Sequence, residues 1–428
     1  MGRKEELMNR TTKIIKALLG GLVLFLVFAL AGLAAAQTWI QLTPTGGPPD
    51  GRLRHTAVYD SVNDCMIVFG GVKFEGGKCV QLNDVWVLSN AKGVSGTPLW
   101  NQLTPSGGPP NSRWGHTAVY DQFNNRMIVF GGDRANMCSY NIWPELNDVW
   151  VLSNANGLDG PPVWTQLTPS GGPPPGRATH SAVYDETSNR MIIFGGNPSV
   201  GHCYGDMNDV WVLSNANGLG GTSTWTQLTP SGGPPANRSY HTAVYDSLNN
   251  RMTIHGGAVQ CSTPYGDVWV LEKANGTGGT PEWTQLVPPG TSPGLRAGHT
   301  SVYDQTSNRM MFFGGWSGDW PLGWGISSEV WVLSNANGLG APVWTQLTAS
   351  GGPPAARYGH TTVYDASSNR MIVFGRDDIT PGFSNEVWVL TDASGIVEIS
   401  DTTPPVIVPI VTPAPNASGW NNTNVTVS

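Results

Sequence analysis

The sequence predicts an all-β protein, a six-bladed β-propeller whose blades are four-stranded antiparallel sheets and whose ring is closed by the N-terminal strand. Three observations lead to this prediction. The segment RxxHTAVYD, or a close variant of it, occurs six times. Each copy is followed by further short runs rich in Val, Ile, Tyr, Phe and Trp, and Asn, Gly and Pro separate these runs. The last copy lacks its fourth run, and an equivalent run precedes the first copy.

Each repeat contains four runs of strand-forming residues, named here strands a to d. Strand a reads HTAVYD, strand b MIVFGG, strand c DVWVL and strand d WTQL, with small variations. The histidine that opens strand a recurs at intervals of 61, 64, 61, 58 and 61 residues. A single meander of this kind has two apolar faces, and a radial ring of copies buries both faces while leaving only short edges.

The two ends of the repeat region explain how the ring closes. The first strand d, residues 39–42, comes before the first strand a, and the last strand c ends at Leu390 with no WTQL run after it. The N-terminal strand should therefore complete the sixth blade, so that six blades follow and not seven.

Paired glycines after an apolar strand b, an aromatic residue in strand c and a Trp that opens strand d resemble the kelch family over roughly residues 38 to 390. The resemblance implies that each repeat forms one propeller blade, similar to the central propeller of galactose oxidase.

Residues outside the repeats predict a three-part organisation: 1–36, 37–395 and 396–428. A basic stretch leads into the apolar run of residues 17–36, which ends in Ala34-Ala35-Ala36. This is typical of a signal peptide, and an uncleaved membrane anchor is the alternative. Residues 396–428 are expected to be a linker and the truncated start of a bacterial immunoglobulin-like module. We expect a secreted or cell-surface protein, or one anchored with the propeller outside.

Composition excludes one class of partner. The formal net charge is −7 and only 12% of residues are charged. A nucleic-acid-binding surface needs clustered Lys and Arg, and the repeats contain no such cluster, so no nucleic-acid partner is expected. The sequence implies no cofactor and no metal site, and it does not indicate an oligomeric state.

Residues that recur in every blade are best explained by packing. The six histidines are expected to form structural hydrogen bonds rather than a metal site: His55, His116, His180, His241, His299 and His360. The Arg three residues before each histidine is expected to pair with the acid that opens strand c. These arginines are Arg52, Arg113, Arg177, Arg238, Arg296 and Arg357, and the acids are Asp84, Asp148, Asp209, Asp267, Glu329 and Glu386.

Strand order places the d–a and b–c loops at one end of the propeller, named here the b–c face, and the a–b and c–d loops at the other, named the a–b face. The b–c loops differ in every blade, so the b–c face is the predicted binding surface. Aromatic residues beside charged ones suit stacking on sugars or anchoring a protein. The candidate ligand-binding residues are Asp133, Arg134, Trp143, His202, His255, Trp316, Trp320, Trp324, Arg376 and Asp377. The alternative is that the tryptophans only cap their own loops.

Export makes disulfides possible. Four cysteines fall in b–c loops and are disulfide candidates: Cys79, Cys138, Cys203 and Cys261. The pairs Cys79–Cys138 and Cys203–Cys261 are favoured, although sequence does not determine connectivity. Cys65 lies toward the a–b face and is the expected free thiol.

Three functions are compatible with these patterns. The first is a non-catalytic, extracellular binding or adhesion module for glycan or protein, because no HExxH, GxSxG or other catalytic constellation is present. The second is a sugar-acting enzyme, since kelch propellers include a copper-radical oxidase and a sialic-acid mutarotase. The oxidase motifs cannot be matched in this chain. The third is a structural spacer in a longer surface protein.

Overall fold

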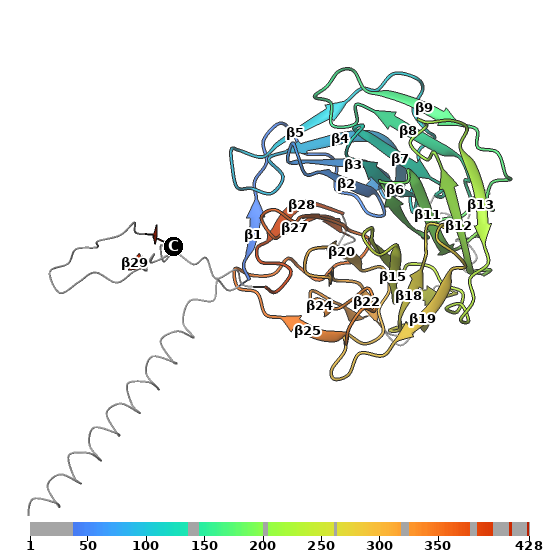
Figure 1. Cartoon of the computed structure of the whole chain (residues 1–428). Coiled ribbons are helices and arrows are strands. Elements are labelled where there is room, and N and C mark those ends of the chain that lie inside the picture. The colour runs from blue at the N-terminus through green and yellow to red at the C-terminus, as the bar shows by residue number, and fades with distance from the viewer. Residues whose placement is uncertain are drawn as a thin grey trace, which may run out of the picture. The chain divides into compact units, whose positions relative to one another are not determined.

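The structure is a computed structural model that describes residues 37–135, 145–199, 204–260, 263–317, 325–376, 383–396, 411–412 and 426–427. Residues 36–396 form one compact unit. In it, six four-stranded antiparallel sheets are arranged in a ring (Figure 1). The predicted six-bladed β-propeller is confirmed. The described residues contain no helix, and so none that could cross a membrane.

Each blade is a meander of four consecutive strands, except that the sixth takes its outer strand from the N-terminal end. Blade 1 contains β2 (Thr56–Asp60), β3 (Cys65–Glu75), β4 (Lys78–Ser89) and β5 (Leu99–Leu103). Blade 2 contains β6 (Thr117–Asp121), β7 (Arg126–Phe130), β8 (Val149–Ser153) and β9 (Val163–Leu167). Blade 3 contains β10 (Ser181–Asp185), β11 (Arg190–Gly196), β12 (Met207–Ser214) and β13 (Thr224–Leu228).

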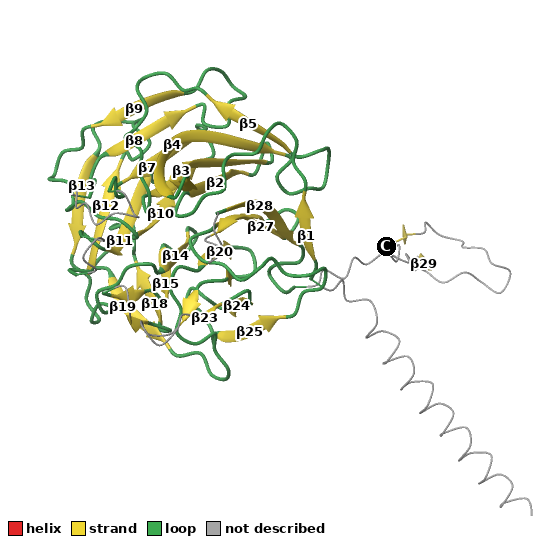
Figure 2. Cartoon of the chain, turned by 180° about the vertical axis from the view of Figure 1, so that it is seen from behind, coloured by secondary structure: helices red, strands yellow, loops and turns green. Residues whose placement is uncertain are grey.

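The remaining blades follow the same order. Blade 4 contains β14 (Thr242–Asp246), β15 (Arg251–His255), β18 (Val268–Glu272) and β19 (Glu282–Leu286). Blade 5 contains β20 (Thr300–Asp304), β21 (Arg309–Phe313), β24 (Val330–Ser334) and β25 (Val343–Leu347). Blade 6 contains β26 (Thr361–Asp365), β27 (Arg370–Arg376), β28 (Ser384–Leu390) and β1 (Trp39–Leu42). Strand a lies innermost in every blade, as β2, β10, β14 and β20 show from behind (Figure 2).

Three short strand pairs lie outside the blades. The b–c loops of blades 4 and 5 contain β16 (Ala258–Val259) with β17 (Thr263–Pro264), and β22 (Trp316–Ser317) with β23 (Gly325–Ile326). In the C-terminal segment, β29 (Val411–Thr412) pairs with β30 (Thr426–Val427).

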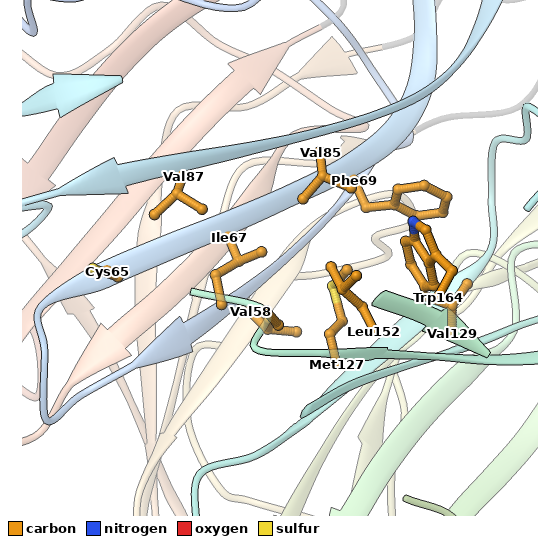
Figure 3. Close-up of a cluster of buried hydrophobic side chains, with 11 residues drawn as sticks. Val58, Cys65, Ile67, Phe69, Val85, Val87, Met127, Val129, Leu152 and Trp164 are labelled. Atoms are coloured by element: carbon orange, nitrogen blue, oxygen red, sulfur yellow. The ribbon is translucent and has the colours of Figure 1, made fainter. Parts of the chain in front are cut away.

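The core lies between blades because successive side chains of a strand point to opposite faces of its sheet. In β3, Ile67 and Phe69 pack against Met127 and Val129 of blade 2 (Figure 3). The alternate residue Val68 packs with blade 6 instead. Each blade thus has two buried faces, and neither face is complete without a neighbour.

Ring closure follows the prediction. β1 pairs antiparallel with β28, with Trp39 opposite Leu390. The Trp39 ring lies 5.1 Å from Phe313 of blade 5, just as Trp164 lies 5.1 Å from Phe69 at the blade 1–2 junction. The N-terminal strand therefore supplies both the last hydrogen-bonded edge and the last large core residue.

The predicted scaffold contacts are present. Arg52 is fully buried and donates to both carboxylate oxygens of Asp84 at 2.8 Å, and each of the other five blades contains the equivalent ion pair. Burial alone would raise the pKa of Asp84, but the Arg52 hydrogen bonds and charge hold it below its usual value. His116 Nε2 is 2.9 Å from Thr56 Oγ1 of blade 1, and the other five histidines make the same contact with the preceding blade.

Replacing Trp39 by Ala should lower the free energy of unfolding by about 3–5 kcal/mol, because it leaves a cavity at the closing junction. Ile40→Ala on the same strand is the matched control, since Ile40 is exposed; it should cost less than about 1 kcal/mol. Urea unfolding of both variants measures the difference. Equal, small losses would mean that β1 does not close the ring.

Candidate functional site

A closed ring of six backbone hydrogen bonds surrounds the propeller axis near the b–c face. The residue before each strand-a histidine donates its N–H to the carbonyl of the equivalent residue in the preceding blade, at 2.7–3.2 Å. The six residues are Arg54, Gly115, Thr179, Tyr240, Gly298 and Gly359. We call this set the axial ring. Because each residue is both donor and acceptor, the axial ring fixes the distance between neighbouring blades.

All six residues of the axial ring have positive φ angles, between 54° and 66°. Glycine adopts this conformation freely, and three blades have glycine here. Arg54, Thr179 and Tyr240 adopt it at a cost of roughly 1 kcal/mol each. Glycine would suit the backbone better at these three positions, so the presence of larger residues is more simply explained by a role of their side chains than by a requirement of the fold.

Arg54 crosses the axis. Its guanidinium carbon lies 4.9 Å from the ring centroid of Trp114 and 4.9 Å from that of Tyr240. Tyr240 belongs to blade 4, which is diametrically opposite blade 1 in a ring of six. The Arg54 side chain forms no hydrogen bond or ion pair with any described residue. Among the described residues, its guanidinium is therefore positioned by aromatic contacts.

Asp133 lies beside this group. Its backbone pairs with that of Trp114, and its Oδ1 accepts a hydrogen bond from the Ala135 N–H. Burial raises the pKa of Asp133, and the positive charge of Arg54 opposes this effect. Arg134, next in the chain, is exposed.

The Tyr240 side of the site is apolar. Tyr240 and Tyr358 pack against a buried cluster that contains Ala258, Ala297 and Trp316. The Trp316 ring covers Gly298 of the axial ring so closely that a Cβ there would lie 3.1 Å from it. The site is thus a half-buried guanidinium between aromatic residues at the axis. We call Arg54, Trp114, Asp133, Tyr240 and Trp316 the axial cluster.

The structure corrects three of the predicted ligand-binding residues. His255 is fully buried between blades 4 and 5, where its ring stacks on Phe312, because its position in strand b faces the core. Trp316 is 3% exposed and Asp133 is 2% exposed. Both residues belong to the axial cluster, but their side chains are buried against other residues of the protein and are not exposed for a ligand. The Trp316 side chain packs against Ala258 and Ala297, which lie in other loops.

The other predicted ligand-binding residues are exposed, half-buried or outside the described residues. Arg134 is exposed, and Arg376 is half-buried at the end of β27. Trp143, His202, Trp320, Trp324 and Asp377 lie outside the described residues. The d–a and b–c loops do share one end of the propeller. In blade 1, the d–a residue Leu53 forms a β-bridge with the b–c residue Val72, and blades 2 to 5 have the equivalent bridge.

Blade 1 adds a projecting hairpin to the b–c face. β3 and β4 stay paired beyond the blade as far as Glu75 and Lys78. Phe74 and Val80 on this hairpin are exposed, and the Phe74 ring contacts Phe383 edge-on. Exposed apolar side chains on an extended hairpin suit contact with a protein partner.

Two of the five cysteines, Cys65 and Cys79, lie among the described residues. Cys79 is disulfide-bonded, and Cys138, Cys203 and Cys261, the remaining candidates for its partner, lie outside the described residues. Cys65 is a free, buried thiol. Burial raises the pKa of Cys65 to about 12, with Asp60 and Asp64 adding to the effect, so this thiol is unreactive.

The histidines are built into the scaffold. Burial lowers the pKa of His55 well below its usual value, and the charge of Arg52 lowers it further. The five equivalent histidines have the same shift. Burial lowers the pKa of His255 to about 3. Among the described residues, no group of three or more His, Cys, Asp or Glu is arranged to hold a metal ion.

Sequence reasoning missed Arg54, Trp114 and Tyr240. They occupy the two variable positions of RxxH, which read LR, WG, AT, SY, AG and YG in successive blades. Variation inside an otherwise invariant motif is the signal that could have found them.

Comparison with known proteins identifies the repeat. A family model described as the KLHDC2/KLHL20/DRC7 Kelch-repeats domain matches residues 27–216 and 162–338, more than half of the chain. The chain belongs to the kelch-repeat family. Kelch propellers are typically protein-binding modules.

Curated relatives are larger proteins. Adagio-like protein 3 of Oryza sativa subsp. japonica is 26% identical over 83% of this chain and 50% of its own length. Host cell factor homolog hcf-1 of Caenorhabditis elegans is 27% identical over 77% of this chain and 35% of its own length. The chain spans about half the length of the first of these kelch proteins. A solved structure titled "Structure of YjhT" is 15% identical, with a TM-score of 0.56 over 81% of this chain and 95% of its own, and shares the fold.

The buried histidines predict acid sensitivity. Each stays neutral in the folded kelch propeller, whereas in the unfolded chain it takes up a proton below about pH 6.5. Stability is therefore full above pH 6.5 and falls as the pH decreases, by up to about 1.4 kcal/mol per pH unit for each histidine.

His255→Phe introduces the residue that all five other blades have at this position and removes one of these groups. Urea unfolding between pH 6 and pH 5 should show a dependence of the unfolding free energy on pH that is smaller than that of the unmodified protein by up to about 1.4 kcal/mol per pH unit. Identical slopes would mean that His255 is protonated in the folded state.

Proposed function

We propose that this kelch propeller is a non-catalytic, exported protein-binding module, and that its b–c face recognises a carboxylate of the partner at Arg54. The observation that carries the proposal is the Arg54 guanidinium, which is held between Trp114 and Tyr240 without a hydrogen-bond acceptor among the described residues. A guanidinium presents donors in a planar fork that matches a carboxylate. Aromatic contacts on the faces of the guanidinium do not use the N–H donors at its edge.

The surroundings of Arg54 suit a protein ligand. The described part of this face carries Arg134 and Arg376 together with the exposed acids Asp50 and Glu75, while Asp133 is buried. Phe74 and Val80 supply exposed apolar area on the blade 1 hairpin. A charged anchor near the centre with apolar contacts around it is a common arrangement in protein interfaces.

Export is part of the proposal. The basic start and the apolar run of residues 17–36 support it. The disulfide at Cys79 also supports it, because disulfides persist in oxidising compartments. The immunoglobulin-like interpretation of residues 396–428 would make the chain part of a longer surface protein, in which a binding role and a spacer role are compatible.

A glycan ligand is the second candidate. The glycan hypothesis depended on four tryptophans. Trp316 is buried, and Trp143, Trp320 and Trp324 lie outside the described residues. A sugar-acting enzyme would need an accessible acid–base pair, and His255 is buried in the core. The described contacts therefore favour a protein ligand over a glycan.

The proposal is tested by binding the full chain to an array of acidic peptides, each paired with its Glu→Gln and Asp→Asn counterpart. Acidic peptides should bind and their amide counterparts should not. Arg54→Gly should weaken binding at least about tenfold, because a charge-assisted hydrogen-bond pair is lost. The variant should fold, because three blades already have glycine at this position.

Thr179→Gly is the matched control. It makes the same change in the axial ring without removing a charge, so peptide binding should remain. Unchanged binding by Arg54→Gly would refute the assignment of the site, and equal binding of acidic and amide peptides would refute the carboxylate.

A further inference from the structure

The a–b face of the propeller carries apolar side chains that packing within the propeller does not explain. The residue after the c–d loop glycine is Val94, Leu158, Leu219, Thr277 or Leu339 in blades 1 to 5. In blade 6, which has no c–d loop, Ile396 follows Gly395 at the equivalent position, so the residue is apolar in five blades of six. Recurrence normally indicates packing. Yet Val94, Leu158, Leu219 and Leu339 are exposed.

The a–b turns add a second group on the same face. Phe123 is 84% exposed, Leu248 is 81% exposed and Val62 is 78% exposed. These three residues occupy one repeat position, two residues after the Asp that ends strand a. We call the two groups together the apolar tips. They come from four different c–d loops and three different a–b turns, so they are spread around the ring and do not form one compact patch.

Both ends of the propeller unit leave at this set of loops. β1 begins at Trp39, opposite Leu390, and the Thr391 N–H donates to the Thr38 carbonyl. Gln37 and Ile396 thus take the place that the c–d loop has in the other five blades. Directly before Gln37 in the sequence are 20 consecutive residues without a charge, residues 17–36. As a helix they would be about 30 Å long, the thickness of the hydrocarbon core of a bilayer.

We propose that residues 17–36 remain as a membrane anchor and that the a–b face rests on the lipid bilayer through its apolar tips. Only Gln37 and Thr38 separate residues 17–36 from β1 in the sequence. Because the apolar tips are spread around a ring, a flat, extended surface can contact all of them at once. A bilayer is such a surface, and its interface accepts apolar side chains without a complementary pocket. The opposite, b–c face then points away from the membrane, where a partner can reach it.

The proposal does not depend on the carboxylate site, and its test is separate. The full chain is reconstituted into phosphatidylcholine–phosphatidylglycerol vesicles after an environment-sensitive fluorophore has been attached at Phe123→Cys, Leu158→Cys or Thr187→Cys. Thr187 is exposed at the same turn position in blade 3 and loses no apolar residue when replaced. Phe74→Cys on the b–c face is the control, and the parental chain measures labelling of native thiols.

The a–b face probes should shift to shorter emission wavelength and lose roughly half or more of their emission to spin-labelled lipid, whereas the Phe74 probe should not. The mass of the membrane-extracted protein should include residues 17–36. A mature protein that begins at Gln37 overturns the proposal. So does an emission shift without lipid quenching, which would instead indicate a second copy or residues 397–428 on this face. Equal quenching at all sites also overturns it.

Discussion

The axial ring of backbone hydrogen bonds is the constraint on which the rest of the molecule depends. A blade of this kelch propeller has two apolar faces, and it is stable only when a neighbour covers each of them. The axial ring sets the neighbours at one fixed spacing. At that spacing the strand-a histidines reach the hydroxyl groups of the preceding blade, and Trp164 fills the space against Phe69. It also determines which side chains can meet at the axis.

The same ring connects the scaffold to the candidate site. Its six residues need a positive φ angle, and three blades satisfy this with glycine. The blades that use Arg54 and Tyr240 instead place a guanidinium and an aromatic ring at the axis, 4.9 Å apart. The repeat therefore tolerates different side chains at one position of a rigid frame, which is how a symmetric fold acquires an asymmetric surface.

Residues that repeat could be predicted from the sequence, and residues that differ between blades largely could not. The missing WTQL run after Leu390 correctly predicted that β1 completes blade 6. The RxxH motif and the acid of strand c correctly predicted the Arg52–Asp84 pair and its equivalents. His255 was misplaced because it breaks the pattern, although its position in strand b alternates toward the core as Phe69 and Phe130 do. Contact between Arg54 and Tyr240 could not be predicted, because it depends on the diameter of the ring.

The central claim is that the two faces have different roles, with the b–c face for a protein partner and the a–b face for the membrane. The most direct measurement uses a photo-crosslinking phenylalanine derivative at Phe74 or at Phe123 of the full chain in lipid vesicles, with a selected acidic peptide bound. Both side chains are exposed, on the b–c face and the a–b face respectively. We predict peptide adducts from position 74 and lipid adducts from position 123. Peptide adducts from position 123, or lipid adducts from position 74, would contradict the division of roles between the two faces.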